Sequence, residues 1–227
     1  MIILKWKYNC NNLKTNNIMK KTVKVALMLA LGLMVAGSAC AQVMETTTYD
    51  DGRVYTGQRN SKGKIEGQGM MTWPNGDRYE GQWKKGMPHG EGTFTYANGI
   101  VYHGQWEKNV AKGQGTITMP NGVVIEGTWT SMGDGTGIMT WADGTRYEGG
   151  FVSGAPQGQG VKIWPNGDRY EGNFDRGHMS GKGKFVGANG VSYDGNWLND
   201  QYNGQGKYIS AEGEVMEGIW RAGKLQQ

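Results

Sequence analysis

The chain has 227 residues, of which 40 are Gly and only 5 are Pro, and it carries a formal net charge of +4. Gly at this level without a Gly-X-Y period excludes collagen, and an aromatic content of 11% is too high for ordinary disorder. Because each Gly costs a helix about 1 kcal/mol relative to Ala, the composition also disfavours a helix-rich globule.

The positive charge comes from the N-terminal 41 residues, which contain six Lys and no Asp or Glu. Without these six, 18 basic residues stand against 20 acidic ones, so residues 42–227 carry a net charge of −2. A mildly acidic chain without a basic stripe is poorly suited to bind the phosphate backbone of a nucleic acid. We therefore expect no nucleic-acid partner.

The first 41 residues have the three parts of a bacterial secretory signal peptide: a Lys-rich start from Met19, an apolar run over 25–36, and a small-residue exit. The run has 12 residues, short of the roughly 20 that a membrane-spanning helix needs. We predict that residues 1–41 are a cleavable signal peptide. Residues 1–18 are either an upstream extension, with the true start at Met19 rather than Met1, or an unusually long charged region.

Two alternatives remain for the processing site at the end of this signal peptide. Ala39-Cys40-Ala41 fits cleavage before Gln42, whereas the preceding residues resemble a lipobox that would leave Cys40 lipidated, although Gly37 stands where a bulky aliphatic residue is usual. Both predict an exported chain, in the periplasm, at the cell surface or secreted, with a lipid anchor in the second case. Cys10 also lies in the leader, so after cleavage we expect no disulfide, thiolate metal site or Cys nucleophile.

The rest of the chain repeats itself with a period of 23 residues. Seven Gly-x-Gly pairs follow one another at intervals of 23, 23, 22, 23, 23 and 23 residues, starting at Gly67, Gly90, Gly113, Gly135, Gly158, Gly181 and Gly204. Two units show the full pattern: Gly67-Gln-Gly-Met-Met-Thr-Trp-Pro-Asn-Gly-Asp-Arg-Tyr-Glu-Gly-Gln-Trp83 and Gly158-Gln-Gly-Val-Lys-Ile-Trp-Pro-Asn-Gly-Asp-Arg-Tyr-Glu-Gly-Asn-Phe174. We predict a degenerate N-terminal capping repeat over 42–66 and seven repeats over 67–227.

The pattern G-x-G-x-x-x-[aromatic]-x-[Asn/Asp]-G-x-x-Y-x-G-x-[aromatic] resembles the MORN repeat over residues 49–227. The resemblance implies an accessory module: arrays of this family serve as protein-interaction scaffolds and dimerisation elements, and contact with phospholipid membranes has been proposed for them. Some are fused to lipid kinases or lysine methyltransferases. Beyond the leader and the repeats we find no sequence for such a domain, nor its phosphate-binding and catalytic motifs, so we expect neither activity.

Each unit has the sequence of a β-hairpin. In the unit that starts at Gly67 we predict strands over 70–73 and 78–83, joined by Pro74-Asn75-Gly76-Asp77, where Pro fixes φ and Gly permits a positive φ. Strand alternation places Tyr79 and Trp83 on one face, with Gly81 as a gap between them. The gap would let a neighbouring ring or backbone approach closely.

One hairpin buries too little surface to be stable alone, so neighbouring units must pack together. We therefore predict an all-β fold: an elongated, single-layer antiparallel array of β-hairpins. With strands about 4.8 Å apart, seven units would form a rod or curved trough roughly 65 to 70 Å long.

The sequence offers little chemistry. A recurrent acid just before the second-strand Gly is better explained by cross-strand pairing with Arg or Lys on a solvated face than by paired catalytic carboxylates: Glu80, Glu126, Glu148, Glu171, Asp194 and Glu217. His89, His103 and His178 lack metal-ligand spacing, and His89 and His178 fall in predicted loops. The Gly-rich stretch from Gly133 to Gly137 lacks the features of a phosphate loop and is read as a tight connection. We predict no catalytic, cofactor-binding or metal site.

The aromatic residues are the remaining candidates. They would form the core of the array, or a row that stacks on sugar rings or contacts a partner, or both at once if a single-layer sheet leaves part of each ring exposed. The candidates are Trp73, Tyr79, Trp83, Tyr96, Tyr102, Trp106, Trp129, Trp141, Tyr147, Trp164, Tyr170, Phe174, Tyr193, Trp197 and Trp220.

We therefore predict a non-enzymatic, exported scaffold that binds a protein partner in the cell envelope. The alternative is a module that binds envelope glycan or phospholipid through its aromatic rows. Exposed terminal strands also predict self-association as a homodimer. A glycosidase-like enzyme is the remaining hypothesis, with the recurrent acids as its only candidates.

Overall fold

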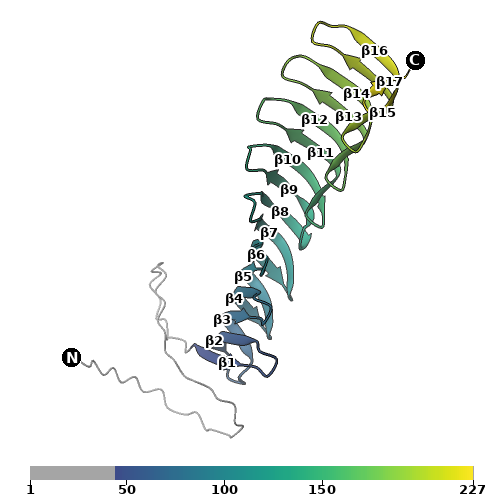
Figure 1. The fold of residues 1–227 in the computed structure, drawn as a ribbon. Coiled ribbons are helices and arrows are strands. Elements are labelled where there is room, and N and C mark those ends of the chain that lie inside the picture. The colour runs from purple at the N-terminus through teal and green to yellow at the C-terminus, as the bar shows by residue number, and fades with distance from the viewer. Residues whose placement is uncertain (1–43, 227) are drawn as a thin grey trace, which may run out of the picture.

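The computed structural model describes residues 44–226, which form one open sheet of 17 antiparallel strands (Figure 1). The prediction of an all-β hairpin array is confirmed. Across these residues the structure contains no helix, and hence none long and apolar enough to cross a membrane. The predicted signal peptide and the fate of Cys40 lie outside the described residues.

The strands are short and evenly spaced along the chain. They are β1 (Glu45–Thr48), β2 (Val54–Arg59), β3 (Ile65–Thr72), β4 (Arg78–Lys84), β5 (Met87–Thr95), β6 (Val101–Glu107), β7 (Val110–Thr118), β8 (Val124–Ser131), β9 (Asp134–Thr140), β10 (Arg146–Val152), β11 (Ala155–Ile163), β12 (Arg169–Asp175), β13 (His178–Val186), β14 (Ser192–Leu198), β15 (Gln201–Ile209), β16 (Val215–Arg221) and β17 (Lys224–Leu225).

Every strand pairs only with its neighbours in the chain, from β1 with β2 through to β16 with β17. The result is a narrow, elongated stack that runs from β1 at one end to β16 at the other, with the connections forming its two long rims (Figure 1). Each unit therefore touches mainly the units on either side of it, as in other repeat proteins.

The first rim consists of the predicted hairpin turns. In the turn between β3 and β4, the Trp73 amide donates to the Asp77 carbonyl over 2.9 Å, and the Gly76 amide donates to the Trp73 carbonyl over 3.0 Å. Gly76 has a φ of 93°, which explains why Gly recurs at this place. The strand before the turn is longer than predicted: β3 begins at Ile65 rather than at residue 70 and includes the Gly-x-Gly pair.

The second rim consists of tight turns that stack on one another. Between β4 and β5, Lys85 and Gly86 both have positive φ, 54° and 79°. The Gly86 amide donates to the Ile65 carbonyl of the preceding unit over 2.9 Å. This contact ties one unit to the next at the rim, in addition to the sheet hydrogen bonds.

Candidate functional site on the apolar face

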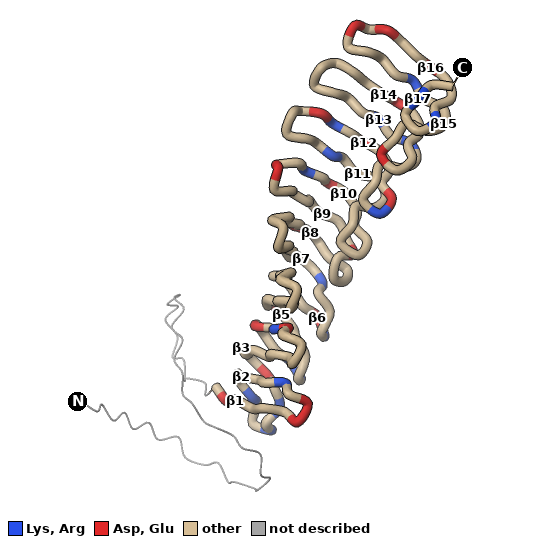
Figure 2. The backbone as a smooth tube through the Cα atoms, in the orientation of Figure 1, with Lys and Arg blue, Asp and Glu red and all other residues tan. Residues whose placement is uncertain are grey.

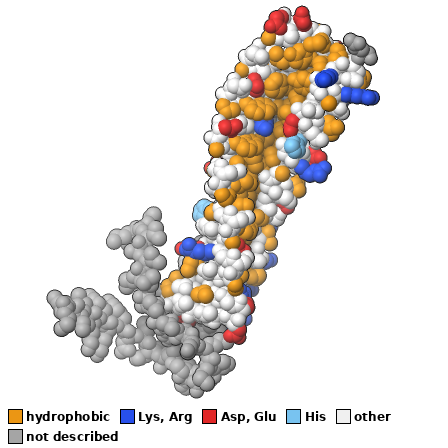
Figure 3. Space-filling model, in the orientation of Figure 1, with side chains coloured by type: hydrophobic (Ala, Val, Ile, Leu, Met, Phe, Trp, Pro, Cys, Tyr) orange, Lys and Arg blue, Asp and Glu red, His pale blue; other side chains and the backbone are white. Residues whose placement is uncertain are grey.

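The two faces of the sheet differ as the alternation predicts. Tyr79 and Trp83 of β4 are buried, whereas Arg78, Glu80 and Gln82 of the same strand are exposed. We call the side of the sheet that carries Tyr79 and Trp83 the apolar face, and the side that carries the other three the polar face. Figure 3 shows hydrophobic side chains of the array gathered in a stripe between its two rims.

Tyrosines lie directly on the sheet of the apolar face. The ring of Tyr79 covers Gly81 and the opposing Gly92, and any side chain at either Gly would collide with it. Its hydroxyl donates to the Gln82 carbonyl over 2.9 Å. The prediction that Gly81 makes room for a ring is correct, but the ring is the tyrosine of the same strand, which folds back over the glycine pair.

Tryptophans and phenylalanines separate successive tyrosines. Tyr79 makes edge-to-face contacts with Trp83 of its own strand and with Trp106 of the next unit, with ring centroids 5.0 and 5.3 Å apart. The Trp83 indole N–H donates to the Gly69 carbonyl over 2.9 Å, so its one polar atom is satisfied within the apolar face. This interlocking arrangement carries the packing from one unit to the next.

The predicted candidate aromatics fall into two groups by burial. Those in the second strand of each hairpin are buried: Tyr79, Trp83, Tyr102, Trp106, Trp129, Tyr147, Tyr170, Phe174, Tyr193, Trp197 and Trp220. Those at the hairpin turns are only partly buried: Trp73, Tyr96, Trp141 and Trp164. Only the second group offers surface that an incoming molecule can touch without unfolding a unit.

The apolar face also presents side chains that the sequence reasoning missed. The first strand of each hairpin adds partly buried residues, among them Phe94, Phe185 and Tyr208. The sequence could have identified them, because most units hold an apolar residue two positions before the hairpin turn. Lys162 occupies this position in β11 and is the exception, since its ammonium group lies 5.2 and 4.9 Å from the ring centroids of Trp141 and Trp164.

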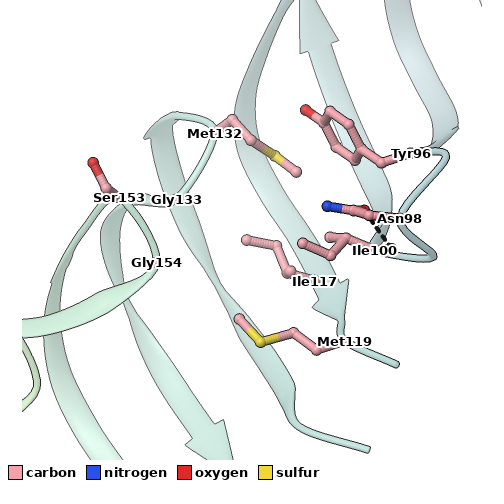
Figure 4. A pocket seen from close by; sticks show the side chains of 9 residues that line it. All are labelled: Tyr96, Asn98, Ile100, Ile117, Met119, Met132, Gly133, Ser153 and Gly154. Carbon is pink, nitrogen blue, oxygen red and sulfur yellow. Dashed lines mark hydrogen bonds between the residues drawn. The ribbon is translucent and has the colours of Figure 1, made fainter. Parts of the chain in front are cut away.

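The apolar face is hollowed where the repeat is one residue short. A cavity of about 320 Å³ lies between the rims there, and Met132 reaches from the turn after β8 toward Tyr96 and Ile117 (Figure 4). Two features reduce the bulk of this unit. Ile125 stands where most other units have Tyr, and Gly135 lies opposite Trp129, where Pro88 lies opposite Trp83 in another unit. The hollow interrupts the regular aromatic packing near the middle of the array.

The polar face carries the recurrent acids, as predicted, and three of them pair with Arg, but along one strand rather than across strands. Glu148 pairs with Arg146 over 2.8 Å and Glu171 pairs with Arg169 over 2.6 Å, each two residues apart on one strand rather than across strands. Glu80 pairs with Arg78 in the same way. Residues i and i+2 share a face, so a long Arg reaches its neighbour along the strand. Charges of both signs are dispersed along the whole array (Figure 2).

The histidines lie on strands. His103 is exposed on the polar face with its Nδ1 2.9 Å from the Thr93 hydroxyl, and the Nδ1 of His178 lies 2.6 Å from an Asp200 carboxylate oxygen. The prediction that His89 and His178 lie in loops is wrong, because they belong to β5 and β13, which begin directly after the tight turns. Between residues 44 and 226, no three His, Cys, Asp or Glu side chains gather as metal ligands would.

Burial shifts the ionisation of the tyrosines that lie on the sheet. Desolvation raises the pKa of Tyr55, Tyr102 and Tyr147 to about 12, and it raises the pKa of Tyr79 and Tyr170 further still. These hydroxyls therefore remain protonated at any physiological pH and keep donating to their carbonyl partners.

The unit of this array is that of a known family. The MORN repeat matches at residues 61–78, 79–101, 102–124, 132–146, 147–169, 170–192 and 193–215. The chain belongs to the MORN repeat family. MORN repeats are generally modules that interact with proteins or membranes, and proteins built from them are typically non-enzymatic scaffolds. The gap in the matches at 125–131 falls in the unit with Ile125.

No curated protein sequence matches this MORN-repeat chain significantly. Among solved structures, similar ones include the TCP domain of Drosophila melanogaster SAS-4 (dCPAP) in complex with a proline-rich motif of Ana2, at 13% identity and a TM-score of 0.38 over 84% of this chain and 99% of that one. The TCP10 domain of Danio rerio CPAP in complex with a STIL peptide has 15% identity and a TM-score of 0.31 over 88% and 100%.

Proposed function

We propose that this MORN-repeat protein is a non-enzymatic scaffold, exported to the cell envelope, that binds a protein partner through the apolar face of its sheet. The observation that supports it is the partly buried row on that face. Trp73, Tyr96, Trp141 and Trp164 at the hairpin turns, together with Phe94 and Phe185 on the strands, leave ring surface open along the array. Aromatic side chains half covered by their own protein are well suited to anchor a partner.

The polar face is a weaker candidate for the same role. Three of its recurrent acids, Glu80, Glu148 and Glu171, form exposed ion pairs with arginines of the same strand, so this face offers little apolar area. The leader sequence motivates the envelope location, and recovery of the mature N-terminus by mass spectrometry tests it. A mature chain that retains residues 1–41 would contradict the location without touching the proposed binding face.

The binding face is tested by matched variants on the two sides of the sheet. Trp164→Ala and Phe185→Ala remove apolar-face rings, and Arg169→Ala and Lys184→Ala remove charged groups from the polar face. In chemical cross-linking of the native envelope, we expect the first pair to lose the partner band and the second pair to keep it. Loss of the band in the second pair alone would show that the partner binds the other face.

A second candidate, a glycan- or phospholipid-binding module, is favoured by one observation. Trp141 and Trp164 are partly buried tryptophans on neighbouring hairpin turns, the kind of residue on which a sugar ring stacks. Retention of the protein on a polysaccharide affinity gel, or its flotation with liposomes, would favour this candidate if cross-linking recovered no protein.

A further inference from the structure

Lys162 is a cation in a row of apolar side chains. It lies on β11 directly opposite Tyr147 and Tyr170, both fully buried on the apolar face. The same place in other units is apolar: Met71, Phe94, Ile117, Met139, Phe185 and Tyr208. A charge in such a row loses solvation, so it requires compensation from its surroundings.

Two indole rings supply part of that compensation. The Lys162 ammonium lies 5.2 Å from the Trp141 ring centroid and 4.9 Å from that of Trp164, within the range of cation–π attraction. The rings belong to successive hairpin turns and frame the ammonium on the apolar face. Both are partly exposed, so the framed cation remains open to an incoming group.

The cation has no carboxylate partner among the described residues. Lys162 takes part in none of the ion pairs found between residues 44 and 226. The carboxylate of Asp143, on the same rim, accepts the Thr145 amide over 2.8 Å. That hydrogen bond is the main reason that the pKa of Asp143 is lowered, and Lys162 contributes least. Asp143, whose carboxylate Lys162 influences, is thus engaged by the backbone.

We propose that Lys162, framed by Trp141 and Trp164, receives a carboxylate of the protein partner, carried by an acidic side chain in an otherwise apolar, extended segment. This inference rests on the proposed function and names the chemistry that the apolar face selects. A partner that only covered the two indoles would not need a cation at this place, since the uncharged Met71 and Met139 occupy it in other units.

The surroundings of Lys162 favour a single carboxylate over a polyanion. The next hollow along the face is lined by Trp164 and Phe185 but also by the acids Asp168 and Asp200. A membrane of anionic lipids would meet these two carboxylates beside the one cation, whereas a peptide can place one acid at Lys162 and apolar groups on either side.

The repeat also sets the spacing of the segment. Two strands advance the array by about 9.6 Å, and an extended or polyproline-type chain advances about 3.1 to 3.4 Å per residue. About three residues therefore span one unit. A segment that runs along the array would carry apolar residues about three positions before and after its acid.

A random peptide library displayed on phage is the probe, selected against the purified full chain. We expect selected peptides to share an Asp or Glu flanked by apolar residues at that spacing. By fluorescence anisotropy, the Kd of the best peptide should rise at least about tenfold on Lys162→Met and stay unchanged on Lys184→Met, which removes a charge from the polar face. Lys162→Arg keeps the cation and should retain binding.

A double-mutant cycle tests whether Lys162 pairs directly with the acid of the peptide. Changing the acid of the peptide to its amide should weaken binding to the wild type, but cause little further loss on Lys162→Met. If Lys162→Met fails to fold, Lys162→Gln takes its place in the cycle. Selection of no peptide, absence of acids among the selected peptides, or equal Kd values for wild type and the neutral variants would overturn the inference.

Two further outcomes separate this inference from the proposed function. If Trp164→Ala and Phe185→Ala abolish peptide binding while Lys162→Met does not, the apolar face binds protein but Lys162 selects no acid. If phosphatidylglycerol vesicles bind the wild type and not Lys162→Met, the anion is a lipid phosphate and the proposed carboxylate is wrong.

Discussion

At the scale of single residues, the glycines on the apolar face carry the strictest requirement. A Cβ on Gly172 would lie 2.5 Å from the Gly183 Cα and 2.5 Å from the Tyr170 hydroxyl oxygen, far inside any normal contact. The backbone of Gly172 is extended, so the requirement is one of space and not of φ. Gly is required here because the Tyr170 ring lies over this position of the sheet.

Gly172→Val should therefore destabilise the array strongly. We expect a loss of about 2 to 3 kcal/mol in the free energy of unfolding, because the Tyr170 ring must leave the sheet. Glu171→Gln, its neighbour on the polar face, should change the stability by less than about 0.5 kcal/mol. Urea unfolding followed by Trp fluorescence measures both, and equal midpoints would refute the assignment of the two faces.

The buried tyrosines predict a fall in stability at high pH. Desolvation raises the pKa of Tyr147 from 10.0 to about 12, so the unfolded chain releases this proton first. The contribution of the protonated Tyr147 hydroxyl to the free energy of unfolding is complete below pH 10. It is lost progressively between pH 10 and 12 and does not fall further above that range.

Absorbance of tyrosinate measures this directly. The difference between wild type and Tyr147→Phe isolates one hydroxyl, and we expect its ionisation to stay suppressed at pH 11 as long as Trp fluorescence reports a folded array. A tyrosinate signal with an ordinary midpoint near pH 10 in the folded protein would show that the ring is not buried.

At the scale of the hairpin, each unit is held by the ring of its second strand. Trp129 and Trp220 donate their indole N–H to the Gly115 and Gly206 carbonyls over 2.9 and 3.0 Å, and both rings are buried. They differ in position, since Trp129 has neighbours on both sides and Trp220 belongs to the last full strand. In a linear array, that difference should decide how far a defect spreads.

Truncation of either ring to Ala should cost about 3 to 5 kcal/mol locally. For Trp129→Ala we expect amide hydrogen exchange to accelerate from β7 to β10, while for Trp220→Ala we expect the acceleration to stay within β15 to β17. The same uniform acceleration over all strands in both variants would mean that the array unfolds as one cooperative unit.

The sequence predicted the hairpin, its two faces and its period because these depend on spacing and on alternation along a strand. It did not predict how side chains fold over the sheet. That Tyr79 covers its own Gly81, or that Glu148 pairs with Arg146 along one strand, depends on rotamers that spacing alone leaves open. The hollow at Met132 likewise follows from two neighbouring changes of size rather than from any motif.

At the scale of the whole molecule, the array has a polar face with exposed ion pairs and an apolar face with partly covered rings. The place of Lys162 on the apolar face becomes evident only when the units are superimposed. Only the structure brings it between Trp141 and Trp164, which are 21 and 2 residues away in the sequence. We therefore expect a partner to bind at the apolar face.

Site-specific photo-cross-linking in intact cells tests this expectation, with p-benzoylphenylalanine placed either at Phe185 or at Lys184. These adjacent residues of β13 lie on opposite faces, and the first change replaces one aromatic ring with another. We predict a protein adduct from position 185 and none from position 184. Adducts from position 184 alone, or from both positions equally, would contradict the claim that the apolar face is the binding face.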